Sequence, residues 1–294
     1  MSTTESIDRR HIGLDTWSDE NILDALLDGQ RRAIAAVDSA KPMLAAAATA
    51  IAGRMAAGTG RIVYAGAGSS GVIAALDGIE LLGTFGWPEE RVAFVLASGD
   101  RLAPFAGGEE DDAHAARSAM AALGLGPGDA VIAVAASGTT PYTLAAIETA
   151  GGFGALTVGI ASNAETPLLR AADVPILLDS GPEMIVGSTR MGAGTAQKVA
   201  LNLISTLTMI RLGHVYDGLM VSLRADNLKL RGRAIRILRH ITGSSEEAAA
   251  DALGRCGGRI KPAVLVLKGH SPEEAESILA EYGGNLRAAL GRFR

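Results

Sequence analysis

Two loops rich in glycine and hydroxyl side chains have the residue types that bind anions. Each follows a short apolar run: RIVYA leads into Gly66–Gly71 (GAGSSG), and AVIAVAA leads into Ser137–Pro141 (SGTTP). Serine and threonine hydroxyls donate hydrogen bonds to phosphate oxygens, and glycines let a ligand approach the backbone. A helix that begins directly after such a loop adds unpaired amides and a partial positive charge. The two loops together predict a phosphate site.

The residues expected to bind the phosphate are those at the turns of the two loops: Gly68, Ser69 and Ser70 in the first, and Ser137, Gly138, Thr139 and Thr140 in the second. A simpler interpretation is that each hydroxyl only caps the helix that follows it. For one loop alone the two interpretations are equally good, whereas a pair of such loops favours a ligand.

The glycine spacing of the first loop also matches a nucleotide motif. Gly66, Gly68 and Gly71 fit the dinucleotide fingerprint, which needs an acid about 20 residues further on, at the end of the next strand. The nearest acid at that strand end, Asp100, is over 30 residues from Gly66. A P-loop is excluded because the GK[ST] ending is missing. The spacing therefore does not favour a nucleotide.

Two groups of carboxylates are candidates for acid–base chemistry. Glu80 lies among apolar residues of the helix expected after the first loop, and it faces either solvent or a cavity. The run Glu109–Asp112 follows two glycines and fits the first turn of a helix, where acids complement the helix dipole. Both a catalytic and a structural role are open for each group.

The elements that would position these residues are those of an α/β fold. Five short apolar runs read as strands buried on both faces, and helices between them indicate a parallel sheet with right-handed crossovers. These runs are Arg61–Ala65, Val92–Ala97, Ala130–Ala136, Leu156–Ser162 and Val174–Asp179. Helices are expected over 18–58 and 190–212, with Pro42 restarting the first pattern.

The chain is expected to divide into three parts. They are an N-terminal helical segment over 1–45, an α/β domain over 46–230 and a small helical domain over 231–294. Within the last part, Lys261–Lys268 (KPAVLVLK) has the local propensity of a strand.

Composition excludes several classes of protein. The 294 residues are 48% hydrophobic and 20% charged, as in a globular chain, and the net charge of −5 argues against a nucleic-acid partner. The N-terminus is polar, where a signal peptide would be apolar. The longest apolar stretch, Pro42–Gly53, is shorter than the ~20 residues that a membrane span needs. Both features predict a soluble protein that is not exported. The single Cys256 fits the cytoplasm, and no histidine spacing suggests a metal.

Three strings resemble the N-acetylmuramic acid 6-phosphate etherase family of the sugar isomerase (SIS) superfamily. They are GAGSSG, ASGTTPY and above all the segment 181–198, GPEMIVGSTRMGAGTAQK. The resemblance covers nearly the whole chain, and the segment 181–198 is its most specific part.

The resemblance implies a homodimer of flavodoxin-like SIS domains that holds a phosphorylated aminosugar at the strand ends, without metal or organic cofactor, while composition and charge give no reason to expect a nucleic-acid or membrane partner. The site would be completed across the subunit interface. It also implies a helical C-terminal bundle in place of the strand read at 261–268. Such enzymes cleave the D-lactyl ether of N-acetylmuramic acid 6-phosphate, which gives N-acetylglucosamine 6-phosphate and D-lactate during cell-wall recycling.

Residue roles follow from the same resemblance. Glu80 matches the catalytic acid–base, and Asp111 the second catalytic carboxylate, where the family has Glu and where Glu109 or Glu110 could substitute. Glu183, Ser188 and Lys198 match substrate-binding positions. The chain also differs from the family pattern at Val72 and Thr139, where Arg is usual, and at Gly192, where Lys is usual.

Two other functions are compatible with the same loops. An aldose–ketose phosphosugar isomerase removes the same C2 proton without a leaving group. A non-catalytic SIS protein binds a sugar phosphate and changes the activity of a partner.

Overall fold

The computed structural model describes residues 3–99, 107–225 and 227–291. Asp100, weighed above for a nucleotide site, lies outside them. The chain forms two compact units, one of Met1–Gly78 with Glu90–Leu207 and the other of Ile79–Glu89 with Thr208–Arg294. The α/β class is confirmed by a five-stranded parallel sheet in the first unit.

The sheet has the order β2-β1-β3-β4-β5, and all of its strands are parallel. The five strands coincide with the five apolar runs: β1 (Ile62–Gly66), β2 (Val92–Leu96), β3 (Ala130–Val134), β4 (Leu156–Ala161) and β5 (Val174–Leu177). Every residue of β1, β3 and β4 is buried, which explains why their sequences are apolar without alternation.

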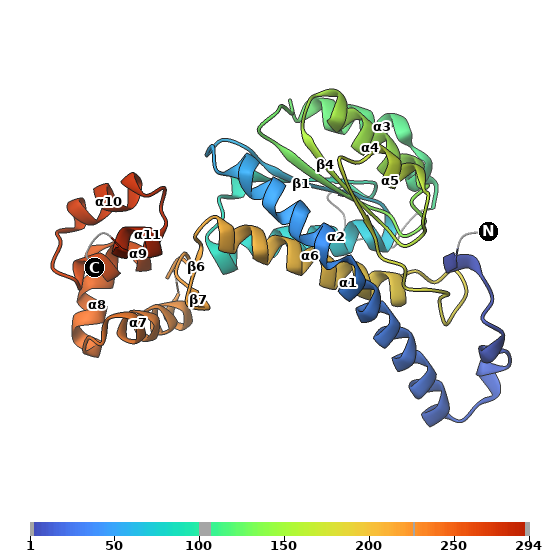
Figure 1. The fold of residues 1–294 in the computed structure, drawn as a ribbon, viewed down its shortest axis with the longest axis horizontal. Helices are drawn as coiled ribbons and strands as arrows, with labels where there is room; N and C mark the ends of the chain where they lie inside the picture. The colour runs from blue at the N-terminus through green and yellow to red at the C-terminus, as the bar shows by residue number, and fades with distance from the viewer. Residues whose placement is uncertain (1–2, 100–106, 226, 292–294) are drawn as a thin grey trace. The chain divides into compact units, whose positions relative to one another are not determined.

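Helices cover both faces of the sheet (Figure 1). On one face lie α3 (Ala113–Ala122), α4 (Pro141–Gly152) and α5 (Pro167–Ala171), which share a core with β1 and β3. The opposite face carries α1 (Asp19–Met55) and α6 (Gly192–Arg211). The helix that follows β1 is α2 (Gly68–Phe85).

The first helix is a single element. Ser18 caps it by accepting a hydrogen bond from the Asn21 amide, and the helix continues through Pro42 instead of restarting there. By length and composition α1 could cross a membrane. Eleven of its residues are buried, however, and it contacts β4 and β5, as expected of a core helix.

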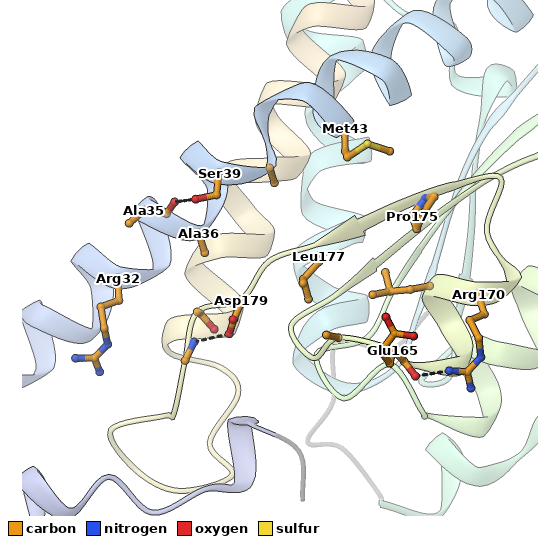
Figure 2. A pocket seen from close by; sticks show the side chains of 15 residues that line it. Arg32, Ala35, Ala36, Ser39, Met43, Glu165, Arg170, Pro175, Leu177 and Asp179 are labelled. Carbon is orange, nitrogen blue, oxygen red and sulfur yellow. Dashed lines mark hydrogen bonds between the residues drawn. The ribbon is translucent and has the colours of Figure 1, made fainter.

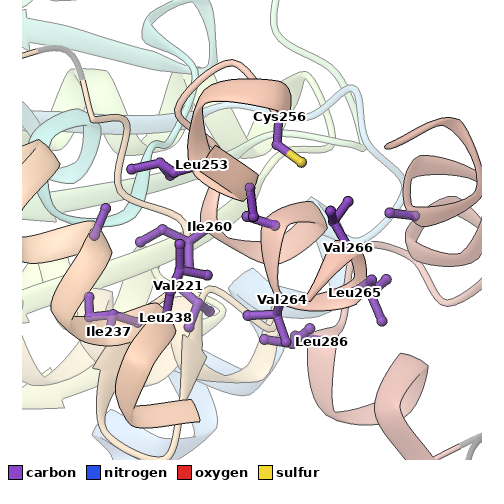
Figure 3. Close-up of a cluster of buried hydrophobic side chains, with 14 of the residues drawn as sticks. Val221, Ile237, Leu238, Leu253, Cys256, Ile260, Val264, Leu265, Val266 and Leu286 are labelled. Atoms are coloured by element: carbon purple, nitrogen blue, oxygen red, sulfur yellow. The ribbon is translucent and has the colours of Figure 1, made fainter. Parts of the chain in front are cut away.

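The second unit is mainly helical. It contains α7 (Leu228–Thr242), α8 (Glu246–Arg255), α9 (Ile260–Val266), α10 (Pro272–Glu281) and α11 (Leu286–Gly291), and a hairpin of β6 (Val215–Tyr216) and β7 (Leu219–Met220). Its core gathers side chains from the five helices and from the segment after the hairpin (Figure 3).

The strand read at 261–268 from local propensity is wrong, because this segment forms α9. Six residues of α9 are buried, and five of them belong to the hydrophobic core of the unit. A short run that is apolar on every side has no periodicity to distinguish a buried helix from a buried strand. The helical bundle implied by the resemblance is the structure that forms.

Candidate functional site

The sheet topology brings the two hydroxyl loops to neighbouring strand ends. Strands β1 and β3 pair directly, with Gly66 opposite Val134, and β2 lies on the far side of β1. The strand order therefore reverses between β1 and β3. In open parallel sheets, ligands bind at the carboxyl ends of the strands at such a switch point.

Close packing of the backbone requires glycine at two positions of the first loop. A Cβ on Gly66 would lie 3.0 Å from the Gly71 Cα, and one on Gly71 would lie 2.9 Å from the Gly66 carbonyl carbon. Strand and helix backbones are thus in contact, and only glycine fits at either position. Gly68, with φ of +53°, opens α2 in the left-handed region. This packing accounts for the glycine spacing without a nucleotide.

The first loop leaves three amides open. The Gly71 amide donates to the Ala67 carbonyl at 3.0 Å and begins the helical ladder. The amides of Gly68, Ser69 and Ser70 precede it and find no acceptor in the described part of the chain. Unpaired amides at a helix start point at the space where an anion binds. The first loop therefore has the free donors that an anion site requires.

A glutamate side chain lies directly over this loop. A Cβ on Gly68 would collide with the Glu110 carboxylate, so the missing side chain is what lets Glu110 approach. Burial raises the pKa of Glu110, and the neighbouring charge of Asp111 raises it further. A carboxyl of raised pKa beside an anion site is suited to proton transfer.

The structure therefore separates the acids that the sequence places in one run. Glu110 ends up at the loop because the short 3-10 helix Gly107–Asp111 turns it toward α2. Asp111 is exposed, and Asp112 caps α3 by accepting from the Ala115 amide at 2.8 Å. Of the alternatives weighed for the second carboxylate, Glu110 has the favourable position.

The second loop is closed by its own hydroxyls. The Ser137 Oγ accepts from the Thr139 amide at 3.2 Å and lies 3.2 Å from the Thr140 Oγ1. The Gly138 amide donates to the Ala135 carbonyl at 3.0 Å, and a Cβ on Gly138 would collide with the Thr166 side chain. The Thr140 side chain does not cap α4, so the simple capping interpretation fails for it.

The segment 181–198 leads into α6. Glu183 is buried, and its carboxylate accepts from the amides of Gly192 at 2.9 Å and Ala193 at 2.8 Å. Glu183 thus fixes the start of α6 and occupies amides that an anion would need. Ser188 and Lys198 are half-buried.

A buried carboxylate that sequence reasoning missed lies on α2. Asp77 accepts hydrogen bonds from the Tyr64 hydroxyl at 2.9 Å, the Asn202 Nδ2 at 2.6 Å and the Ser205 Oγ at 3.1 Å. Burial raises the pKa of Asp77, against the effect of these three donors and of Lys198. Asp77 ties the helix that carries the first loop to β1 and to α6.

Glu80 lies one turn beyond Asp77, in the part of α2 that belongs to the second unit, and its side chain is exposed. A charged residue in an apolar stretch gives the same sequence signal at both positions, so the pattern could not show that Asp77 is the buried one.

A groove of about 910 Å³ lies elsewhere in the first unit, between α1 and the edge strand β5 (Figure 2). Its lining includes Arg32, Met43, Pro175 and Leu177 and none of the loop residues. Since the open amides lie at the switch point, we place the anion site there and not in this groove.

Comparison with known proteins identifies the family. The SIS domain family model matches residues 110–207. A Deinococcus radiodurans protein named N-acetylmuramic acid 6-phosphate etherase is 47% identical over 290 residues, which are 98% of this chain and 95% of that protein. A Rubrobacter xylanophilus protein of the same name is 46% identical over 96% of this chain and 93% of its own. The chain belongs to the N-acetylmuramic acid 6-phosphate etherase family.

A solved structure confirms the fold of the SIS part. A Bacteroides fragilis protein, described as a putative phosphosugar isomerase involved in capsule formation, aligns with a TM-score of 0.52. The alignment covers 67% of this chain and 94% of the other, at 19% identity. At that identity the likeness concerns the fold alone, and the site of this family member rests on its own geometry.

Proposed function

We propose that this protein is an N-acetylmuramic acid 6-phosphate etherase, a carbon–oxygen lyase. It cleaves the D-lactyl ether at C3 of the sugar and releases N-acetylglucosamine 6-phosphate and D-lactate. The observation that carries the proposal is the near-full-length similarity to proteins of that name. The open amides at the switch point support it, because they suit the 6-phosphate.

The phosphate is bound by the first loop, through the amides and hydroxyls of Ser69 and Ser70 and the amide of Gly68. In the open-chain sugar, the aldehyde acidifies the proton on C2. A base removes this proton, the C3–O bond breaks, and an acid protonates the departing ether oxygen, which leaves as the hydroxyl of lactate. Water then adds to the unsaturated aldehyde, with its hydroxyl on C3 and a proton on C2.

Two carboxylates share these proton transfers in our proposal. Glu110 lies against the phosphate loop, and its raised pKa lets it hold a proton closer to neutral pH than an ordinary glutamate. Glu80 is the acid–base at the ether oxygen, as the resemblance implies. The structure supplies the position of Glu110, and the resemblance supplies the role of Glu80.

We further propose that a second copy of the chain brings Glu80 into the site. Its helix presents three apolar side chains at helical spacing: Leu76 is 45% exposed, Ile79 61% and Leu82 43%. Such a row is normally covered by a partner. A homodimer that buries this row would also take Glu80 out of water.

We place the enzyme in the cytoplasm, where sugar phosphates are metabolised and where the buried thiol of Cys256 stays reduced.

Lactate release tests this function directly. The purified protein is incubated with N-acetylmuramic acid 6-phosphate, and D-lactate is measured. We expect release that Glu80→Gln abolishes and that Glu148→Gln, a matched change at an exposed glutamate of α4, leaves intact. Tight sugar-phosphate binding without lactate would favour a sensor, and isomerisation without lactate would favour an isomerase.

A further inference from the structure

The second unit contains a cavity of about 440 Å³ that has no role in the proposed reaction. It lies among the segment after β7, α9 and α10, and its lining includes none of the residues assigned to catalysis or phosphate binding. Much of the wall is apolar, including Val221 and Ile260, whose side chains also belong to the core of the unit (Figure 3). A volume of this size suits a small organic molecule.

The polar part of the wall contains an incompletely paired cation. The Lys261 Nζ donates to the Gly284 carbonyl at 2.8 Å, and it forms no salt bridge with any carboxylate among the described residues. Burial lowers the pKa of Lys261 to about 8. The one acid in the lining, Glu276, pairs with Arg259 at 2.7 Å instead. A half-buried ammonium without a carboxylate gains stability from an anion nearby.

Two more donors of this wall have no hydrogen-bond partner among the described residues. Arg224 pairs through its backbone with Arg259, two residues before Lys261, and its guanidinium has no partner in the described part of the chain. The Ser222 Oγ is buried and makes no hydrogen bond to any described residue. Guanidinium, ammonium and hydroxyl groups are donors that suit a carboxylate, and guanidinium can bind one with two parallel bonds.

We propose that this cavity binds a short aliphatic carboxylate, with its charged end at Arg224, Lys261 and Ser222 and its carbon chain against the apolar wall. A dianion such as phosphate fits less well, because the Glu276 carboxylate lies in the same wall and much of the remaining lining, including Val221, Ile260 and Leu279, is apolar. The proposal stands apart from the etherase activity, since it uses different residues.

A tryptophan close to the cavity can report on binding by its fluorescence. His214 lines it, and the ring of His214 lies 5.7 Å from the ring of Trp87 in an edge-to-face contact. The chain has two tryptophans, so Trp17→Phe leaves Trp87 as the only one. Its fluorescence then reports on the cavity in the full-length protein.

The experiment titrates the full-length Trp17→Phe protein with acetate, butyrate and 4-methylpentanoate at constant ionic strength. We expect a saturable change in Trp87 fluorescence, with affinity rising roughly fourfold for each added methylene, as burial of a methylene implies. Inorganic phosphate at the same ionic strength should leave Trp87 unchanged. Tighter binding of phosphate than of butyrate would overturn the carboxylate assignment.

Two variants locate the binding. Arg224→Gln removes an exposed side chain and should weaken butyrate binding by about tenfold or more, the usual effect of losing a charged hydrogen-bond partner. Lys261→Met should do the same. Arg255→Gln, at an exposed arginine of α8 that pairs with Asp251, is the matched control and should bind butyrate normally. The absence of any saturable response, or equal affinity in Arg224→Gln and Arg255→Gln, would refute the site.

Discussion

The two hydroxyl loops have similar sequences but differ in their internal hydrogen bonds. In the first loop, the amides of Gly68, Ser69 and Ser70 are open, and a glutamate approaches from the side. In the second, the Ser137 hydroxyl takes up the Thr139 amide and closes the turn. Composition therefore identifies where an anion could bind, and the local hydrogen bonds show that the Gly138 and Thr139 amides, unlike those of Gly68, Ser69 and Ser70, are already occupied. In this account the first loop holds the phosphate and the second keeps its neighbour in place.

The largest expected effect concerns the acid at the first loop. Glu110→Gln keeps the shape of the side chain but removes its proton transfer, and we expect kcat for lactate release to fall by roughly 10²–10⁴-fold. Asp111→Asn, next to it and exposed, should have a much smaller effect. Steady-state kinetics of the two variants measure the difference. A larger loss in Asp111→Asn would return the second carboxylate to the position that the resemblance implies.

Alanine at the left-handed glycine of each loop should separate their roles. Gly68→Ala strains a φ of +53° and pushes against Glu110, so we expect the Kd for N-acetylglucosamine 6-phosphate to rise by roughly tenfold as the loop contacts weaken. Gly138→Ala pushes against Thr166 instead and should mainly lower the melting temperature. Calorimetric titration and thermal unfolding of both variants check this. Equal Kd increases would mean that both loops bind the phosphate.

A smaller effect is expected when the second loop loses its internal bond. Ser137→Ala removes the acceptor of the Thr139 amide and should lower the free energy of unfolding by about 1 kcal/mol, with little change in sugar-phosphate affinity. Thr139→Ala removes an exposed side chain and should leave the free energy of unfolding within about 0.5 kcal/mol of the parent. Urea unfolding measures both values. A large affinity loss in Ser137→Ala, without loss of stability, would show that its hydroxyl contacts the ligand.

The smallest effect is a pH dependence of stability. The pKa of Glu110 is raised above its ordinary value of 4.5 in the folded chain. Between pH 4.5 and the raised pKa of the folded chain, the unfolded chain has already released the proton that the folded chain still holds. The free energy of unfolding therefore decreases as pH rises through this range. Glu110→Gln should reduce this decrease, and the part that remains is expected from Asp77, whose pKa is also raised. Urea unfolding at several pH values measures the slope. An unchanged slope in Glu110→Gln would show that Glu110 is not desolvated.

Much of the fold was predictable because it depends on local patterns. Continuous apolar runs predicted every strand of the sheet, and Ser18 predicted the start of α1 within one residue. The alternation of strands and helices predicted a parallel sheet with both loops at the carboxyl ends of strands, whereas the strand order that creates the switch point is known only from the structure. Where the pattern had no period, at Lys261–Lys268, local propensity gave the wrong element.

The site was harder to predict because it depends on contacts between distant segments. Glu110 and Asp111 are neighbours in sequence, and only the turn before α3 decides which one meets Gly68. The resemblance places Glu183 at a substrate-binding position, and only the structure shows that its carboxylate also orders the start of α6. Asp77 gave no signal of its own, since its partners lie on β1 and α6. Glu80 and the dimer that would bury it remain predictions.

In the proposed enzyme, the open amides of the first loop hold the sugar phosphate. Amide chemical shifts of the ¹⁵N-labelled full-length protein, followed during titration with N-acetylglucosamine 6-phosphate, test it most directly. We expect the amides of Gly68, Ser69 and Ser70 to shift saturably and together, while those of Gly138 and Thr139 shift little. Saturable shifts at Gly138 and Thr139, with the first three amides unmoved, would contradict the account.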